Sequence, residues 1–205
     1  AGRPRPVHIE IPLDVLVENA DALLTSLPVS IARPGAAPAA VEQMSQRLIE
    51  AKRPLILAGG GAIDAAPALL QLAERLGAPV ALTINAKGML PASHPLLIGS
   101  TQTLVATRAL VAEADVVLAI GTELAETDYD VTFAGGFEIP GALLRIDIDP
   151  DQTVRNYPPA LALVADAQLA AEALLARISA QALPEREADW GAARAKRLNT
   201  ELAAV

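Results

Sequence analysis

The chain has 205 residues and a formal net charge of −8, which disfavours nucleic acid and anionic membrane surfaces as partners because both bind clustered Lys and Arg. It contains no cysteine and only two histidines, which excludes disulfides and thiolate zinc sites and disfavours a histidine metal centre or a Ser-His-Asp triad. No apolar run approaches the roughly 20 residues of a membrane helix and no secretory signal is visible, so we expect a cytoplasmic protein.

The first 40 residues divide into two segments ahead of the main domain. Residues 6–16 begin as an alternating strand, with Val7, Ile9 and Ile11 on one face, that stops at Pro12. Residues 28–38 are rich in Pro, Gly and Ala and predict an extended linker. The main domain is expected to start after it with an amphipathic helix over 41–51.

From residue 55 onward, strand and helix patterns alternate. Strands are predicted at 55–58, 80–83, 116–120, 143–148 and 161–164, and helices at 65–76, 104–113 and 167–178. This alternation predicts an α/β fold, a three-layer Rossmann-like parallel sheet with helices on both faces. Right-handed crossovers place the strand-to-helix loops on one edge of that sheet, together with the long loops 84–102 and 121–141. Residues 184–205 are charged and helical, and we interpret them as a tail outside the core.

Three glycines follow the first strand of the main domain. Gly59, Gly60 and Gly61 would let backbone N–H groups approach a phosphate, and Asp64 is a candidate N-cap for the next helix. The dinucleotide fingerprint lacks its third glycine, and the second strand ends in Thr83-Ile84-Asn85 without a ribose-binding acid. An ordinary NAD-binding unit is therefore disfavoured, and a tight turn remains the alternative.

Carboxylates follow two other strands. Asp147 and Asp149 point to the same side of a strand end, where they would contact a ribose or adenine. Capping of the next helix by Asp149, ahead of Pro150, is equally open. The segment Thr122–Asp130 holds four acids, which could meet a cation or form a solvated loop.

Two basic residues near the predicted rim, Lys87 and Arg108, are candidate phosphate partners. A solvated role is the commoner one for such a lysine. The sequence predicts no catalytic residue and no metal ligand.

Four motifs occur in a characteristic order: RPLILAGGGAI, LGAPVALTINAKGMLPASHPLLIG, ADVVLAIGTEL and LLRIDIDP. Over about residues 41–178 the chain resembles the central domain of thiamine diphosphate-dependent enzymes of the acetolactate synthase, pyruvate oxidase and 2-oxo acid decarboxylase group. GRPRPVHIEIPLDVL resembles the end of the pyrimidine-binding domain that precedes it in that family.

The resemblance implies that the chain is a fragment. Residues 1–27 would be the remnant of the pyrimidine-binding domain, 28–40 a linker, 41–180 the central domain and 181–205 a tail toward a diphosphate-binding domain. Thiamine diphosphate and Mg²⁺ would be bound by the two missing domains, so the fragment alone would be inactive. The parent would decarboxylate a 2-oxo acid as a homodimer or homotetramer.

In this family the central domain holds FAD, ADP or nothing. The positions that correspond to flavin contacts are Gly59, Gly60, Gly61, Thr83, Ile84, Asn85, Gly99, Gly121, Asp147 and Asp149. Two turns depart from the family pattern: one reads Gly99-Ser100-Thr101-Gln102, and the other places Glu123 where an arginine would face phosphate. Like-charge repulsion between Glu123 and a pyrophosphate disfavours FAD.

An acetolactate synthase-like parent is the first expectation. A decarboxylase of 5-guanidino-2-oxopentanoate is the alternative, because the carboxylates of residues 122–130 could pair with a guanidinium group. A central domain that serves only as a structural spacer is also open. An independent nucleotide-binding module is disfavoured, since the lack of cysteine argues against a zinc-bearing sirtuin.

Overall fold

The computed structural model describes residues 2–3, 5–19, 31–125 and 137–204. Its centre is a sheet of six parallel strands in the order β3-β2-β1-β4-β5-β6. The strands are β1 (Pro54–Ala58), β2 (Val80–Leu82), β3 (Leu97–Gly99), β4 (Val116–Ile120), β5 (Ala142–Asp147) and β6 (Leu161–Val164). This order is that of a doubly wound α/β fold, so the predicted fold class is confirmed.

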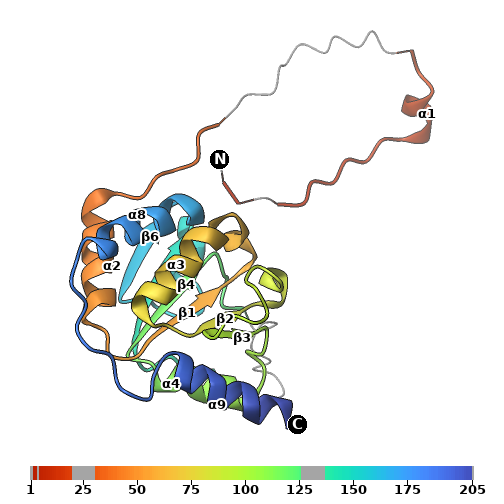
Figure 1. Cartoon of the computed structure of the whole chain (residues 1–205). Helices are drawn as coiled ribbons and strands as arrows, with labels where there is room; N and C mark the ends of the chain where they lie inside the picture. The colour runs from red at the N-terminus through yellow and green to blue at the C-terminus, as the bar shows by residue number, and fades with distance from the viewer. Residues whose placement is uncertain (1, 4, 20–30, 126–136, 205) are drawn as a thin grey trace.

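Helices cover both faces of the sheet (Figure 1). On one face lie α2 (Pro38–Glu50), α3 (Ala66–Leu76) and α8 (Ala167–Ser179), and on the other lie α4 (Val105–Glu113) and α9 (Ala192–Ala203). The shorter elements are α1 (Leu13–Leu16), η1 (Gly60–Ala65), η2 (Ile84–Ala86) and α7 (Pro150–Val154). No described helix has the length and apolar character needed to cross a membrane.

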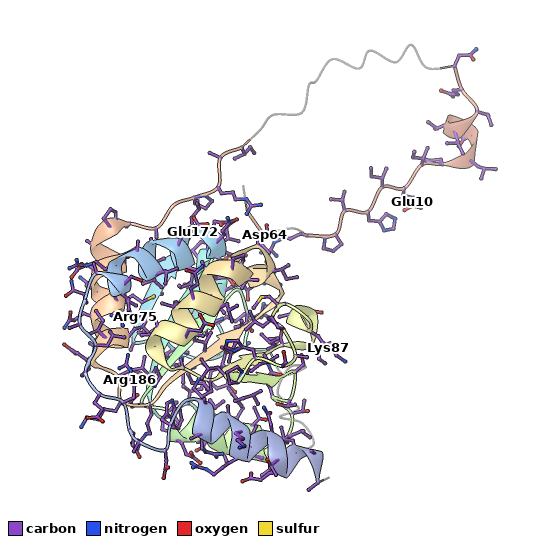
Figure 2. All side chains as sticks on the ribbon, in the orientation of Figure 1. Glu10, Asp64, Arg75, Lys87, Glu172 and Arg186 are labelled. Carbon is purple, nitrogen blue, oxygen red and sulfur yellow. The ribbon has the colours of Figure 1, made fainter. Side chains whose placement is uncertain are left out.

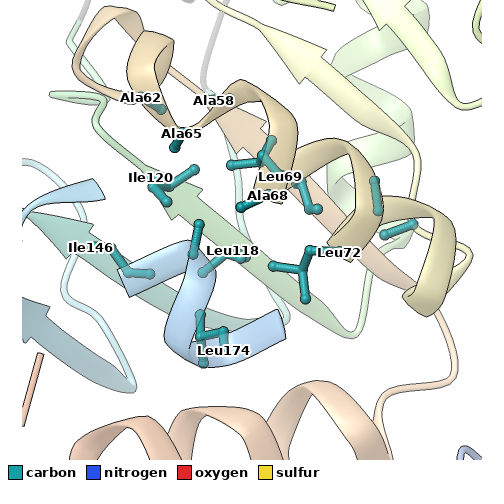
Figure 3. Close-up of a cluster of buried hydrophobic side chains, with 14 of the residues drawn as sticks. Ala58, Ala62, Ala65, Ala68, Leu69, Leu72, Leu118, Ile120, Ile146 and Leu174 are labelled. Carbon is teal, nitrogen blue, oxygen red and sulfur yellow. The ribbon is translucent and has the colours of Figure 1, made fainter. Parts of the chain in front are cut away.

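The side chains of strand β1 show why helices must pack on both faces of the sheet. Leu55 and Leu57 point into the cluster shared with α4 and α9, whereas Ile56 and Ala58 point into the larger cluster shared with α2, α3 and α8. All five β1 residues are buried, as expected for a central parallel strand. The larger cluster is built from Ala, Leu and Ile side chains such as Leu69, Leu72 and Leu118 (Figure 3).

Several boundaries differ from the sequence prediction. Helix α2 begins at Pro38, three residues early, because Pro38 occupies the first turn, where its missing N–H costs nothing. Strand β3 lies inside the predicted loop 84–102. The prediction of Asp64 as an N-cap is wrong, since Asp64 lies within η1 and the N-cap of α3 is Ala65.

The strand predicted for residues 7–11 is not formed. Those residues have no regular structure, and Val7 is 85% exposed. A strand needs a neighbour for its backbone hydrogen bonds, and none of the described strands lies beside this segment. In Figure 1 the segment leaves the sheet domain and reaches α1 well away from it.

The C-terminal residues are not a detached tail, and that interpretation is wrong. Trp190, Ala195 and Leu198 are buried in the same cluster as Leu55 and Val117. The Trp190 indole Nε1–H donates to the carbonyl of Pro54 at 2.8 Å. Residues 184–205 are rich in charged side chains, so the sequence analysis missed a narrow apolar stripe on α9. Helix α9 packs against α4 and β3.

Candidate functional site

A cleft of about 620 Å³ lies at the carboxyl ends of the strands, where the strand order reverses between β1 and β4. Such a reversal opens a crevice in which doubly wound proteins bind their ligands. The described residues that line it come from the loops after β1, β2, β4 and β5, from the start of α8 and from the two N-terminal segments. They include Arg3, Arg33, Gly59, Gly60, Gly61, Asp64, Thr83, Asn85, Gly121, Thr122, Glu123, Asp147 and Asp166.

The glycines form a contact between two loops. A Cβ on Gly59 would lie 2.2 Å from the carbonyl oxygen of Gly121, and a Cβ on Gly121 would lie 2.5 Å from the backbone N of Ala62. Gly121 also has a φ of +59°, a region that glycine favours. The backbones of the two loops therefore pack directly against each other where β1 and β4 end. This contact explains structurally why Gly59 and Gly121 are glycines.

The same contact uses the N–H groups that a phosphate would need. The Gly61 N–H donates to the Gly121 carbonyl at 3.0 Å, the Gly59 N–H donates to Ile120, and the Ala62 N–H donates to Gly59. Three of the four N–H groups of residues 59–62 thus have protein acceptors. A diphosphate does not fit this loop as the structure describes it, because it would have to displace those bonds.

Asp147 and Asp149 have different environments. Asp147 lines the cleft, and its Oδ1 accepts the Asp149 N–H at 2.9 Å. Burial raises the pKa of the Asp147 carboxyl above its usual range, although that N–H and the charges of Arg3 and Arg145 act in the opposite direction. Asp149 caps α7 by accepting the Asp151 N–H at 3.0 Å, so the capping prediction is confirmed.

Arg145 is a buried residue that the sequence analysis did not single out, although it lies in the motif LLRIDIDP. It lies in β5 with 1% exposure, and its guanidinium donates to the carbonyls of Arg155 at 2.6 Å and Thr122 at 2.9 Å. It thereby fixes the start of the loop after β4, which forms one wall of the cleft. A lone arginine inside the apolar run LLRIDI was the available signal.

Two arginines from outside the sheet enter the cleft. Arg3 pairs with Glu123, and Arg33 pairs with Asp64 at 3.0 Å and with Asp166 at 3.4 Å. Hydrogen bonding to Asp64 raises the pKa of the Arg33 guanidinium, and the charges of both acids add to this. Neither arginine was predicted, because the acids that pair with Arg3 and Arg33 lie 31 or more positions further along the chain and no local spacing connects them.

The structure brings most of the predicted site residues together. Lining residues are Gly59, Gly60, Gly61, Thr83, Asn85, Gly121 and Asp147, whereas Ile84, Gly99, Asp149, Lys87 and Arg108 are not among them. Whether the lining residues bind a nucleotide stays a prediction. Of the predicted acidic segment, residues 126–130 lie outside the described residues, and Glu123 lies in the cleft.

No group of three or more His, Asp or Glu side chains that could hold a metal ion occurs among the residues that the structure describes.

Comparison with known proteins decides the family. Residues 41–174 match the thiamine pyrophosphate enzyme central domain family, which covers more than half of the chain. The chain belongs to this family. All six strands of the sheet lie within the matched residues.

Individual relatives are longer than this chain. A protein of Pseudomonas aeruginosa named "Probable 2-ketoarginine decarboxylase AruI" is 42% identical over 99% of the chain and 35% of its own length. A "Probable acetolactate synthase large subunit" of Methanocaldococcus jannaschii is 34% identical over 91% of the chain and 33% of its own length. The chain therefore spans about a third of these relatives.

A solved structure shows the same fold. An X-ray structure described as that of "a putative thiamin diphosphate-dependent enzyme isolated from Mycobacterium smegmatis" superposes with a TM-score of 0.63 at 22% identity. The match covers 81% of the present chain and 31% of the other. At this identity the comparison supports the fold alone.

Proposed function

We propose that this chain is the central domain of a thiamine diphosphate-dependent decarboxylase that acts on a 2-oxo acid with a guanidino side chain. The observation that carries the proposal is the 42% identity to the P. aeruginosa protein over 99% of the chain, compared with 34% over 91% for the acetolactate synthase relative. The guanidino-acid decarboxylase thus replaces acetolactate synthase as the first expectation for the parent.

Within such a parent the chemistry would lie outside this chain. Thiamine diphosphate, with Mg²⁺, supplies the electron sink for loss of CO₂ when it is bound, and the resemblance assigns its binding to the two flanking domains. This chain would contribute a rigid sheet domain, with residues 28–40 as the linker toward the pyrimidine-binding domain, of which 1–27 would be the remnant. Residues 181–205 would lead toward the diphosphate-binding domain, with α9 packed on the sheet. The parent would be a homodimer or homotetramer.

The substrate assignment is tested on the full-length parent. We expect kcat/KM for 5-guanidino-2-oxopentanoate to exceed that for 2-oxopentanoate at least tenfold, because a hydrogen bond to a charged group contributes about 1.5–3 kcal/mol. Steady-state decarboxylation assays with both acids and with pyruvate would measure this. Turnover of pyruvate without turnover of the guanidino acid would contradict the proposal and restore the acetolactate synthase assignment.

We propose further that the central domain acts as a spacer and not as a nucleotide site. Three of the four N–H groups of residues 59–62 have protein acceptors. Among the described lining residues, four carboxylates (Asp64, Glu123, Asp147 and Asp166) outnumber two arginines. An excess of acids repels a diphosphate.

Titration calorimetry of the chain with FAD, ADP and NAD is therefore expected to show no saturable heat below millimolar concentration. The Glu123→Arg variant is the matched comparison, since it restores the charge of the family pattern and should bind ADP more tightly than the wild type. Micromolar binding of any of these nucleotides by the wild-type chain would refute the spacer assignment.

A further inference from the structure

The N-terminal segment returns to the sheet domain through its arginines. Arg3 pairs with Glu123 in the loop after β4, and Arg5 Nη2 lies 2.7 Å from Asp149 Oδ2 at the N-cap of α7. Beyond these two pairs the segment stands clear of the domain, as Figure 2 shows for Glu10. Two arginines thus hold an otherwise unsupported stretch of chain.

The linker is held to the same edge of the sheet by a third arginine. Arg33 bridges Asp64 of η1 and Asp166 at the N-cap of α8. The Asp166 backbone N–H also donates to the carbonyl of Pro34 at 2.9 Å. The linker is therefore fixed to the domain by side chain and backbone together.

The acids that receive these arginines come from four separate elements. Glu123 follows β4, Asp149 follows β5, Asp64 belongs to η1 and Asp166 precedes α8. An isolated exposed ion pair contributes little to stability. Only Arg33 joins two acids, so the stabilisation is expected from three separate contacts made at one edge of the sheet. Arg3 and Glu123 are also partly covered, with 31% and 38% of their side chains exposed.

We propose that Arg3, Arg5 and Arg33 form an arginine latch. Arg3 and Arg33 enter the cleft and Arg5 pairs with Asp149 outside its lining, and together they fix the direction in which residues 5–19 leave the central domain. Glu123, whose charge disfavours a pyrophosphate, has a structural role in the latch, because its carboxylate forms the ion pair with Arg3. The latch and a diphosphate would compete for the same space and for the same arginines. This inference does not depend on the substrate of the parent.

Electron–electron distance measurements between two spin labels test the latch. The chain has no cysteine, so labels attach only at Val7→Cys, two residues after Arg5, and at Glu172→Cys on α8, both exposed positions. We expect one narrow distance distribution at low salt. In the Arg3→Gln/Arg5→Gln variant the width should at least double, and 1 M NaCl should broaden the wild-type distribution in the same way, because the Debye length falls to about 3 Å.

Two comparisons keep the test sharp. Glu123→Gln/Asp149→Asn removes the acids instead of the arginines and should broaden the distribution equally. Arg197→Gln removes an exposed arginine that pairs with Asp189 away from the cleft, so its distribution should match the wild type. A wild-type distribution already as broad as that of the double arginine variant would overturn the latch, as would a variant distribution as narrow as the wild type.

Discussion

The Gly121→Ala variant is expected to lose roughly 3–4 kcal/mol of unfolding free energy, because two costs coincide at this position. The φ of +59° places any L side chain in the left-handed region. The added Cβ would also lie 2.5 Å from backbone atoms of Gly61 and Ala62. Backbone cannot move aside as a flexible side chain can, so the loops after β1 and β4 would have to separate.

Matched glycines divide this loss into its two parts. Gly99 has a φ of +82°, and no atom lies within 4 Å of the position that a Cβ would take there, so Gly99→Ala carries the backbone strain alone and should cost about 1–2 kcal/mol. Gly35 has neither feature, and Gly35→Ala should stay within about 0.5 kcal/mol of the wild type. Urea unfolding of the three variants measures the differences. Equal losses for Gly121→Ala and Gly99→Ala would show that the loop contact is unimportant.

The Arg186→Met variant is expected to lose about 2–3 kcal/mol of unfolding free energy. The Arg186 guanidinium (labelled in Figure 2) donates to the carbonyl of Leu76 at 3.0 Å, at the end of α3, and to three carbonyls at the end of α2. The α2 acceptors are Leu48 at 3.2 Å, Ile49 at 2.9 Å and Ala51. One cation therefore satisfies the free carbonyls of two helices and interacts favourably with both dipoles.

Methionine keeps the apolar stem of Arg186 and removes every donor, so the loss reports on the carbonyl contacts. Burial lowers the pKa of this guanidinium, which means that its charge is held at some desolvation cost, and this keeps the net loss below the sum of its bonds. Arg197→Met is the control, because the ion pair of Arg197 is with exposed Asp189, and it should change stability by less than about 0.5 kcal/mol. Equal denaturation midpoints for the two variants would contradict the role assigned to Arg186.

The latch and the loop contact together change how the glycine loop is understood. A strand, three glycines and a helix are typical of phosphate binding, yet here Gly59 and Gly61 make room for the loop after β4 and donate hydrogen bonds within the protein. The arginines that could attract a phosphate arrive from the N-terminal segments and are paired with carboxylates. These contacts support our proposal that the residues form a cleft and not a nucleotide site.

Much of the fold follows from local pattern. Periodicity and turn residues predicted the exact bounds of β4 and β6, and they predicted the parallel sheet. This was possible because a buried strand and an amphipathic helix are recognised from residues that are adjacent in the sequence. Strand β3 was missed, since three residues give too short a pattern. The face of α9 was missed because its charges outnumber the few apolar side chains that the core buries.

The site divides in the same way. The sequence by itself determined which residues end the strands, and a parallel sheet necessarily brings Gly59, Gly121 and Asp147 to one edge. Only the tertiary structure decided what meets them there: Arg3, Arg33 and Asp166 reach the cleft by chain paths that no local spacing encodes. Tertiary packing also decided that Gly59 and Gly121 touch, because a contact between two loops 62 positions apart depends on the strand order and register of the whole sheet.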